Sequence, residues 1–159
     1  MDVPTLIGLA VAGGTVILNI ISLATPDWLD DIDDHNGLWI DCDDAAGPTL
    51  CQSIGSYAPA FLRATQAMEL MGLLILIASI CCVAVRVVFM KENERLSLLG
   101  GISSIFAGCF MLLGGIIFGA KFTSFGGAAG DLSVGFAMAF VAGALAIVTG
   151  IIFILRRHR

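Results

Sequence analysis

The sequence predicts an all-α membrane protein with four transmembrane helices. The first observation is composition: 58% of the 159 residues are hydrophobic, only 13% are charged, and the mean hydropathy is +0.97. A soluble domain carries about 25% charged residues. The second observation is that four long apolar stretches follow one another, with no polar segment long enough for a separate domain. We therefore expect residues 1–159 to form a single membrane domain.

Each apolar stretch is long enough to cross a bilayer. About 20 apolar residues in a helix span the ~30 Å of hydrocarbon, and a helix satisfies its own backbone where water is absent. The first stretch has no Lys or Arg before it and no small-residue cleavage site after it, so we expect a retained helix, not a cleaved signal peptide. The predicted helices cover about residues 6–23, 64–88, 98–120 and 132–155.

The basic residues set the expected orientation. Six of the eight Lys and Arg residues lie on one side of the membrane if the helices alternate in direction. The positive-inside rule then places both termini and the loop 89–97 in the cytosol, and the loops 26–61 and 121–131 outside. We expect a multi-pass protein of the plasma membrane, with cell junctions as one location. The six basic residues are Arg86, Lys91, Arg95, Arg156, Arg157 and Arg159.

The five cysteines fall into two groups. Cys42 and Cys51 lie in the first outer loop, which faces an oxidising compartment, so a disulfide is their expected state and two free thiols are the alternative. Closing so short a loop should stabilise it by roughly 2–3 kcal/mol. Cys81, Cys82 and Cys109 lie inside predicted helices, where Cys behaves as a small hydrophobe; palmitoylation of the first two is an alternative.

The first outer loop also carries a spaced pattern, W…GLW…C…C, between the first two of the four helices. This pattern resembles the claudin / peripheral myelin protein / epithelial membrane protein / lens membrane protein superfamily, and the resemblance covers essentially the whole chain. The residues that carry it are Trp28, Gly37, Leu38, Trp39, Cys42, Cys51 and Arg63.

The resemblance implies a left-handed four-helix bundle with a small extracellular antiparallel β-sheet. About four strands would come from the first loop and one from the second, and the Cys42–Cys51 bridge would tie two of them. It also implies that Trp39 packs against the membrane-facing base of the sheet. Aromatic rings suit the water–lipid boundary, so Trp28 and Trp39 are either interfacial anchors only or, as we prefer, supports of the loop fold.

Two departures favour one branch of the superfamily. Only ten residues separate Trp28 from Trp39, whereas claudins usually have a longer gap. The chain ends in "ILRRHR" and lacks the hydrophobic PDZ-binding motif that ends many claudins. The resemblance is therefore nearest to the epithelial membrane protein branch.

Residue patterns for catalysis are missing from the sequence. The two histidines, His35 and His158, lie in the first outer loop and the tail, and no Ser–His–Asp grouping, HExxH motif or phosphate-binding loop can be assembled. We expect no enzyme activity, no cofactor, no metal centre and no nucleic-acid partner.

Eight aspartates lie between residues 27 and 44. Four of them are closely spaced before the GLW motif and are candidates for attracting cations or a basic partner. The alternative is a solvated acidic surface. These four candidates are Asp30, Asp31, Asp33 and Asp34.

Glu69 is an acidic residue inside a predicted transmembrane helix. Intramembrane carboxyl groups are costly and suggest a function. The alternative is a side chain that faces the bundle and bonds to a polar neighbour such as Thr65 or Gln66.

Small residues recur at four-residue spacing in the last two predicted helices. Such residues let helix backbones approach closely in a membrane, either within the bundle or between copies of the chain. They are Gly115, Gly119, Ala139, Gly143, Ala146 and Gly150.

These features predict a structural tetraspan protein that organises membranes or cell–cell contacts through its extracellular sheet and by lateral self-association. Its partners would be the lipid bilayer and further copies, in the same membrane and in an apposed one. One alternative is a claudin-type paracellular barrier or cation-favouring pore. Another is an auxiliary subunit of an ion channel or receptor.

Overall fold

Four long helices and a small sheet make up the computed structural model, which describes residues 3–31, 34–43, 50–55, 58–89, 94–124 and 133–155. All four helices are long and apolar enough to cross a membrane. The expected tetraspan architecture is confirmed. The helices are α1 (Val3–Ala24), α2 (Ala60–Val88), α3 (Glu94–Ser124) and α4 (Val134–Leu155).

Two helices begin about one turn before the apolar stretches that predicted them. In α2 the exposed Arg63 interrupts the apolar run but not the helix, which starts directly after Pro59. In α3 the first turn holds Glu94 and Arg95. Both are good helix formers, and an acidic side chain is favourable at a helix N-terminus. Hydropathy therefore marks the membrane span, whereas the helix itself is longer.

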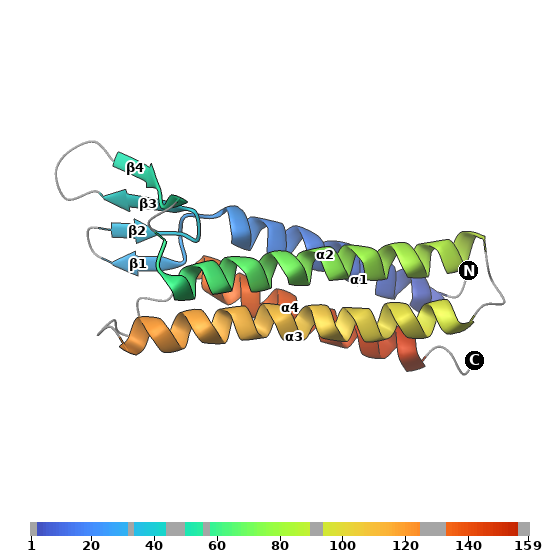
Figure 1. The fold of residues 1–159 in the computed structure, drawn as a ribbon. Coiled ribbons are helices and arrows are strands. Elements are labelled where there is room, and N and C mark those ends of the chain that lie inside the picture. The colour runs from blue at the N-terminus through green and yellow to red at the C-terminus, as the bar shows by residue number, and fades with distance from the viewer. Residues whose placement is uncertain are drawn as a thin grey trace.

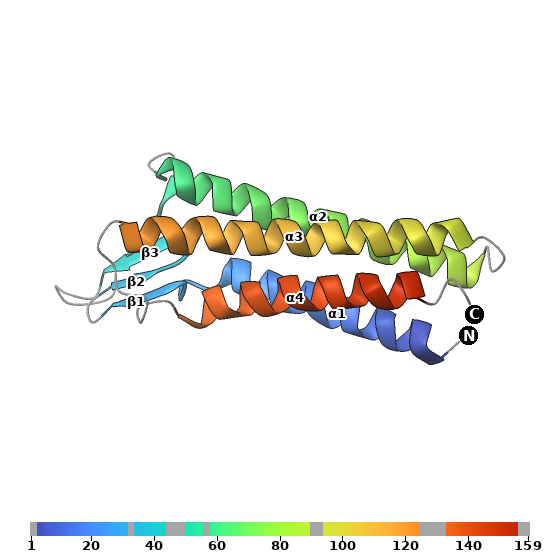
Figure 2. The same ribbon diagram turned by 90° about the horizontal axis from the view of Figure 1, so that it is seen from below.

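The helices form a closed ring in which each packs against its two sequence neighbours, with α4 returning to α1. The contact between α1 and α2 is the smallest of the four. Figure 1 shows the sheet at one end of the bundle and both chain ends at the other. Seen from below, α3 runs beside α2, and α4 runs beside α1 (Figure 2). We call the two ends of the bundle the sheet end and the termini end.

Glycines bring α3 and α4 into backbone contact. A Cβ atom added to Gly108 would lie 2.5 Å from the carbonyl oxygen of Gly143, and one added to Gly150 would lie 2.5 Å from that of Gly101. These two contacts, Gly108 with Gly143 and Gly101 with Gly150, are seven residues apart along each helix. A seven-residue contact period is typical of left-handed helix packing, which agrees with the bundle that the family resemblance implies.

The other small residues singled out in the sequence also lie inside the bundle. Gly115 faces the ring of Phe140, and Gly119 faces the ring of Phe136. Ala139 and Ala146 are fully buried. These residues therefore serve packing within one chain, and their use between copies finds no support in their positions.

Hydroxyl groups add hydrogen bonds between neighbouring helices. Ser79 donates to the carbonyl oxygen of Gly100 at 2.6 Å, and Ser104 donates to that of Ala146 at 2.8 Å. Both carbonyl oxygens lie within helices, where they face the N–H groups of their own helix. The serine hydroxyl reaches each one as a second donor because the acceptor residue is small. Polar contacts of this kind hold membrane helices together where lipid removes the hydrophobic driving force.

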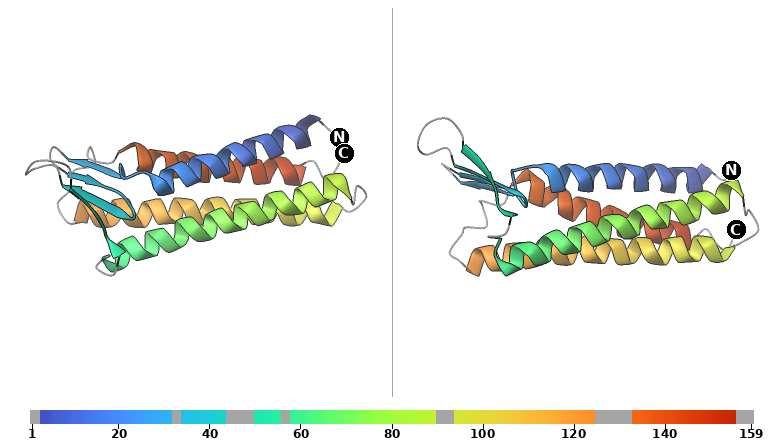
Figure 3. Two further views of the ribbon diagram at one scale, coloured as in Figure 1. Left: turned by 90° about the horizontal axis from the view of Figure 1, so that it is seen from above. Right: turned by 45° about the horizontal axis from the view of Figure 1, so that its top comes forward.

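The sheet is antiparallel and, among the described residues, has four strands in the order β1-β2-β3-β4. All come from the first loop, as expected. It lies beyond the sheet end of the helices, close to the last turn of α1 (Figure 3). The expected fifth strand falls largely on residues outside the described ranges. The strands are β1 (Leu29–Asp31), β2 (Asp34–Asn36), β3 (Ile40–Asp43) and β4 (Leu50–Ser53).

The substitution Gly108→Ala should destabilise the bundle by about 1–3 kcal/mol, because the new methyl group would press on the α4 backbone. Thermal unfolding of the detergent-solubilised protein measures the effect. Gly14→Ala in α1 is the matched control, since a Cβ there meets no atom within 4 Å. Equal melting temperatures for the two variants would contradict the close contact.

Candidate functional site

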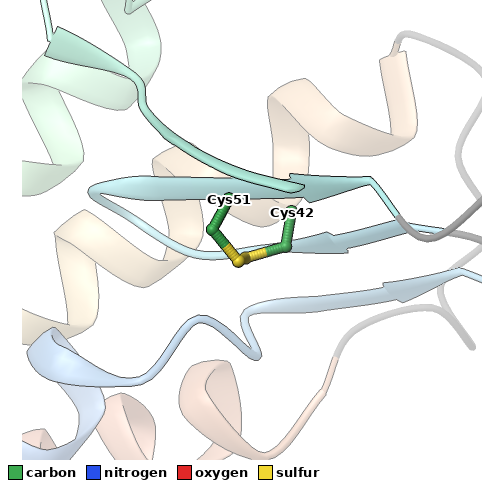
Figure 4. The surroundings of a disulfide bond; sticks show 2 residues. All are labelled: Cys42 and Cys51. Atoms are coloured by element: carbon green, nitrogen blue, oxygen red, sulfur yellow. A yellow bond between two sulfur atoms is a disulfide. The ribbon is translucent and has the colours of Figure 1, made fainter. Parts of the chain in front are cut away.

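The candidate site is the sheet together with the residues that fix it to the helices. In β3 and β4, Cys42 and Cys51 are direct partners in the strand register and are joined by a disulfide. Figure 4 shows the bond crossing from one strand to the next. The expected disulfide is confirmed, and it ties two adjacent strands of the sheet.

Trp28 connects the start of the sheet to three helices. Its side chain is fully buried, and its indole N–H donates a hydrogen bond of 2.7 Å to the carbonyl oxygen of Ser22 in α1. Its ring meets Phe118 of α3 edge-on, with centroids 5.1 Å apart, and Phe136 of α4 at 6.1 Å. An interfacial anchor would face lipid, so that interpretation is wrong for Trp28. This tryptophan supports the fold.

The backbone around Trp28 also caps α4. The N–H groups of Ser133 and Gly135 donate to the carbonyl oxygens of Trp28 and Asp27, at 3.1 and 2.9 Å. The first N–H groups of a helix have no partner within it. Residues 27 and 28 therefore supply the acceptors that α4 needs and fix the sheet to this helix.

The GLW motif lies against the end of α1. A Cβ atom on Gly37 would lie 2.7 Å from the Cα atom of Pro26, so this position requires glycine. Leu38 is fully buried, and its carbonyl oxygen accepts a hydrogen bond from the Gln66 side chain of α2. Trp39 remains 40% exposed. The motif thus buries its leucine rather than its tryptophan.

Arg63 and the aspartates lie at the sheet end. The Arg63 side chain is exposed in the first turn of α2. Asp30, Asp31 and Asp34 fall on β1 and β2, whereas Asp33 lies outside the described residues. Whether these aspartates attract cations stays a prediction.

Asp31, Asp34 and Asp43 follow one another across the strand register. Asp31 pairs with Asp34, and Asp34 pairs with Asp43. The register thus places acidic residues at facing positions of β1, β2 and β3.

Glu69 is fully buried between helices near the sheet half of the bundle. The amide of Asn19 in α1 donates a hydrogen bond of 2.8 Å to its Oε2 atom. The expected partners are wrong: Thr65 donates to the carbonyl oxygens of Phe61 and Gly114. This polar pair crosses the smallest of the four helix contacts.

The same pair leaves two buried acceptors without a partner, namely Oε1 of Glu69 and Oδ1 of Asn19. Buried polar atoms without hydrogen bonds are costly. Sequence reasoning overlooked Asn19, although an amide in an otherwise uncharged transmembrane stretch is itself a signal. Glu69 and Asn19 are thus a polar link inside the membrane.

The three free cysteines lie toward the outside of the helices. Cys81 and Cys109 are exposed on the surface of the chain and Cys82 is half-buried. They lie outside the bundle core, and both the small-hydrophobe interpretation and the palmitoylation alternative stay predictions.

The fold and the site define a tetraspan membrane protein with a disulfide-tied sheet at one end. The family model described as the PMP-22/EMP/MP20/Claudin family matches residues 1–153, so the chain belongs to this family. A search of the curated proteins found no match. The family is a structural membrane family and not an enzymatic one.

We predict that Cys42 and Cys51 resist alkylation in the native protein until a reductant is added, because their sulfurs are bonded to each other. Mass spectrometry of peptides from maleimide-treated protein measures this. Replacing both with Ser should lower the free energy of unfolding by about 2–3 kcal/mol, whereas Cys109→Ala serves as the control. Ready labelling of either loop cysteine without reductant would contradict the bond.

Trp28→Phe should lower the free energy of unfolding by about 1–2 kcal/mol, because it keeps an aromatic ring but leaves the Ser22 carbonyl without its donor. Trp39→Phe is the matched control, since that ring is partly exposed. Thermal melting compares the two. If both variants melt alike, the indole hydrogen bond is not what fixes the sheet.

Removing either member of the polar pair should destabilise the bundle by roughly 1–3 kcal/mol, since the remaining group stays buried without its partner. We therefore expect Asn19→Leu and Glu69→Leu each to lower the melting temperature. The double variant should lose less than the sum of the two. Strictly additive losses would show that the two side chains do not interact.

Proposed function

We propose that the protein is a structural tetraspan of the plasma membrane that organises contacts between membrane proteins or between cells. The observation that carries this proposal is the rigid attachment of the sheet. Trp28 joins it to α1, α3 and α4, and Gln66 joins it to α2. A surface held by every helix of the bundle is preorganised for contact, which lowers the entropic cost of binding.

The proposed orientation places the sheet outside the cell and both termini in the cytosol. The clustering of basic residues supports it, because Arg86 and Arg95 lie at the ends of α2 and α3 that are far from the sheet. Such residues favour the cytosolic side. A disulfide in the sheet agrees with an oxidising exterior.

Lateral self-association would use the outward face of α1. The small residues of α3 and α4 are occupied within the bundle, but Gly13 and Gly14 of α1 have open space where a Cβ would lie. Ala10, one turn earlier, is exposed as well. A face of this kind lets a second helix approach closely. We place the contact between copies there.

The short gap between Trp28 and Trp39 supports a place near the epithelial membrane protein branch. A non-enzymatic role agrees with the structural character of the family.

A second candidate function is a cation-favouring pore or barrier wall. The facing strand positions of Asp31, Asp34 and Asp43 support it, because a cluster of acidic residues raises the local concentration of cations. Partnership with an ion channel or receptor is the third candidate, and the same acidic sheet would then contact a basic surface.

Energy transfer between two fluorescently tagged copies in the same vesicles tests self-association. We expect transfer for the natural sequence and a clear loss for Gly14→Leu, which fills the open face of α1. Ala144→Leu on the outward face of α4 is the matched control. Equal effects of the two leucines would overturn the assignment to α1.

Aggregation of suspended cells that express the protein tests contact between membranes. We expect clustering that is lost when Cys42 and Cys51 are both replaced by Ser. If the cells neither cluster nor show energy transfer between copies, the structural proposal fails. Co-purification with a single channel complex would then favour the auxiliary-subunit alternative.

A further inference from the structure

A small cleft opens between the sheet and the sheet ends of α2 and α3. Its volume is about 200 Å³, and its walls include Leu29, Asp41 and Ile54 on the sheet side and Pro59, Phe61 and Phe118 on the helix side. Sites for drug-sized ligands measure roughly 300–1,000 Å³. The cleft therefore suits a chemical group of only a few heavy atoms.

Two aromatic rings form one wall of the cleft. The centroids of Phe61 and Phe118 are 6.3 Å apart and the rings are tilted by 58°. A cation over the face of a ring is attracted to it when it lies within about 6 Å of the centroid. The 6.3 Å spacing lets one cation in the cleft, beside the two rings, come that close to both centroids. Phe118 is already held in place by Trp28 and Phe136, so the wall is formed before any ligand arrives.

The sheet side of the cleft supplies a negative charge. Asp41 lies on β3 with an exposed side chain, and it alone is charged among the described residues that line the cleft. The remaining lining is mainly aliphatic. A primary ammonium has three N–H donors that need acceptors, and this lining offers few. A quaternary ammonium has no donors, and its methyl groups suit an apolar wall.

The cleft also lies at the depth where lipid headgroups are found. Helices α2 and α3 have 29 and 31 residues, more than the roughly 20 that cross the hydrocarbon, so their ends reach the headgroup region. Phe61 lies in the first turn of α2, and Phe118 lies in the last two turns of α3. We propose that the cleft binds the trimethylammonium group of a choline phospholipid from the leaflet at the sheet end. This proposal does not depend on the proposed function.

Short-chain lipids provide the test. The full-length protein in a maltoside detergent is titrated with dihexanoyl phosphatidylcholine, phosphatidylethanolamine or phosphatidylglycerol, and saturation-transfer NMR measures binding. The three lipids share their acyl chains and differ only in the headgroup. We expect phosphatidylcholine to bind several-fold more tightly than the other two, with transfer to its N-methyl protons.

Variants assign the binding to the cleft. We expect Asp41→Asn and Phe61→Leu each to weaken phosphatidylcholine binding by roughly three- to tenfold, whereas Phe61→Trp keeps the ring and the binding. Asp27→Asn is the matched control, because it removes one charge at the same end of the molecule but not from the cleft wall. Thermal melting of each variant without lipid shows that it is folded.

Four results would overturn the proposal. Equal binding of the three lipids would show that the cleft takes an acyl chain, and no binding would show that it takes none of them. Binding of free choline without binding of the lipid would exclude a lipid as the source. Equal losses for Asp41→Asn and Asp27→Asn would assign the effect to the overall acidic surface.

Discussion

The hydrogen bond between the Trp28 indole and the carbonyl oxygen of Ser22 determines how the sheet is placed on the bundle. It forms at the point where the chain leaves α1, and the same tryptophan contacts aromatic rings of α3 and α4. Ser22 itself donates to the carbonyl oxygen of Gly135 at the start of α4. A single buried residue thus joins the outer and membrane parts, because its large ring fills the space between helices while its N–H satisfies a helix terminus.

Within the membrane, packing depends on the alternation of very small residues and hydroxyl donors. Glycines allow the α3 and α4 backbones to approach, and serines on α2 and α3 donate to carbonyls of facing helices. Lipid chains are as apolar as leucine, so burying leucines gives little preference for one neighbour over another. Specific pairing of these helices therefore comes from shape and hydrogen bonds.

Much of this architecture could be predicted from the sequence because hydropathy and the W…GLW…C…C spacing are local signals. They located the four spans, the sheet and the disulfide. Long-range pairing was harder to predict. Nothing local to Glu69 shows that its partner is Asn19, fifty residues away, and helical spacing alone suggested Thr65 or Gln66. Likewise, the sequence does not show which tryptophan is buried, since both fit a membrane boundary, and only the packing of α3 and α4 around Trp28 decides it.

The disulfide between β3 and β4 also makes the pairing of these strands independent of the residues that connect them. Asp43 and Leu50, which flank residues 44–49, are direct partners in the strand register, next to the bonded Cys42 and Cys51. Doubling the length of a loop with fixed ends costs only about 0.6 kcal/mol. A longer or different connection between Asp43 and Leu50 would therefore cost the strand pairing little. The disulfide-tied strands can thus keep their register while the residues between them change.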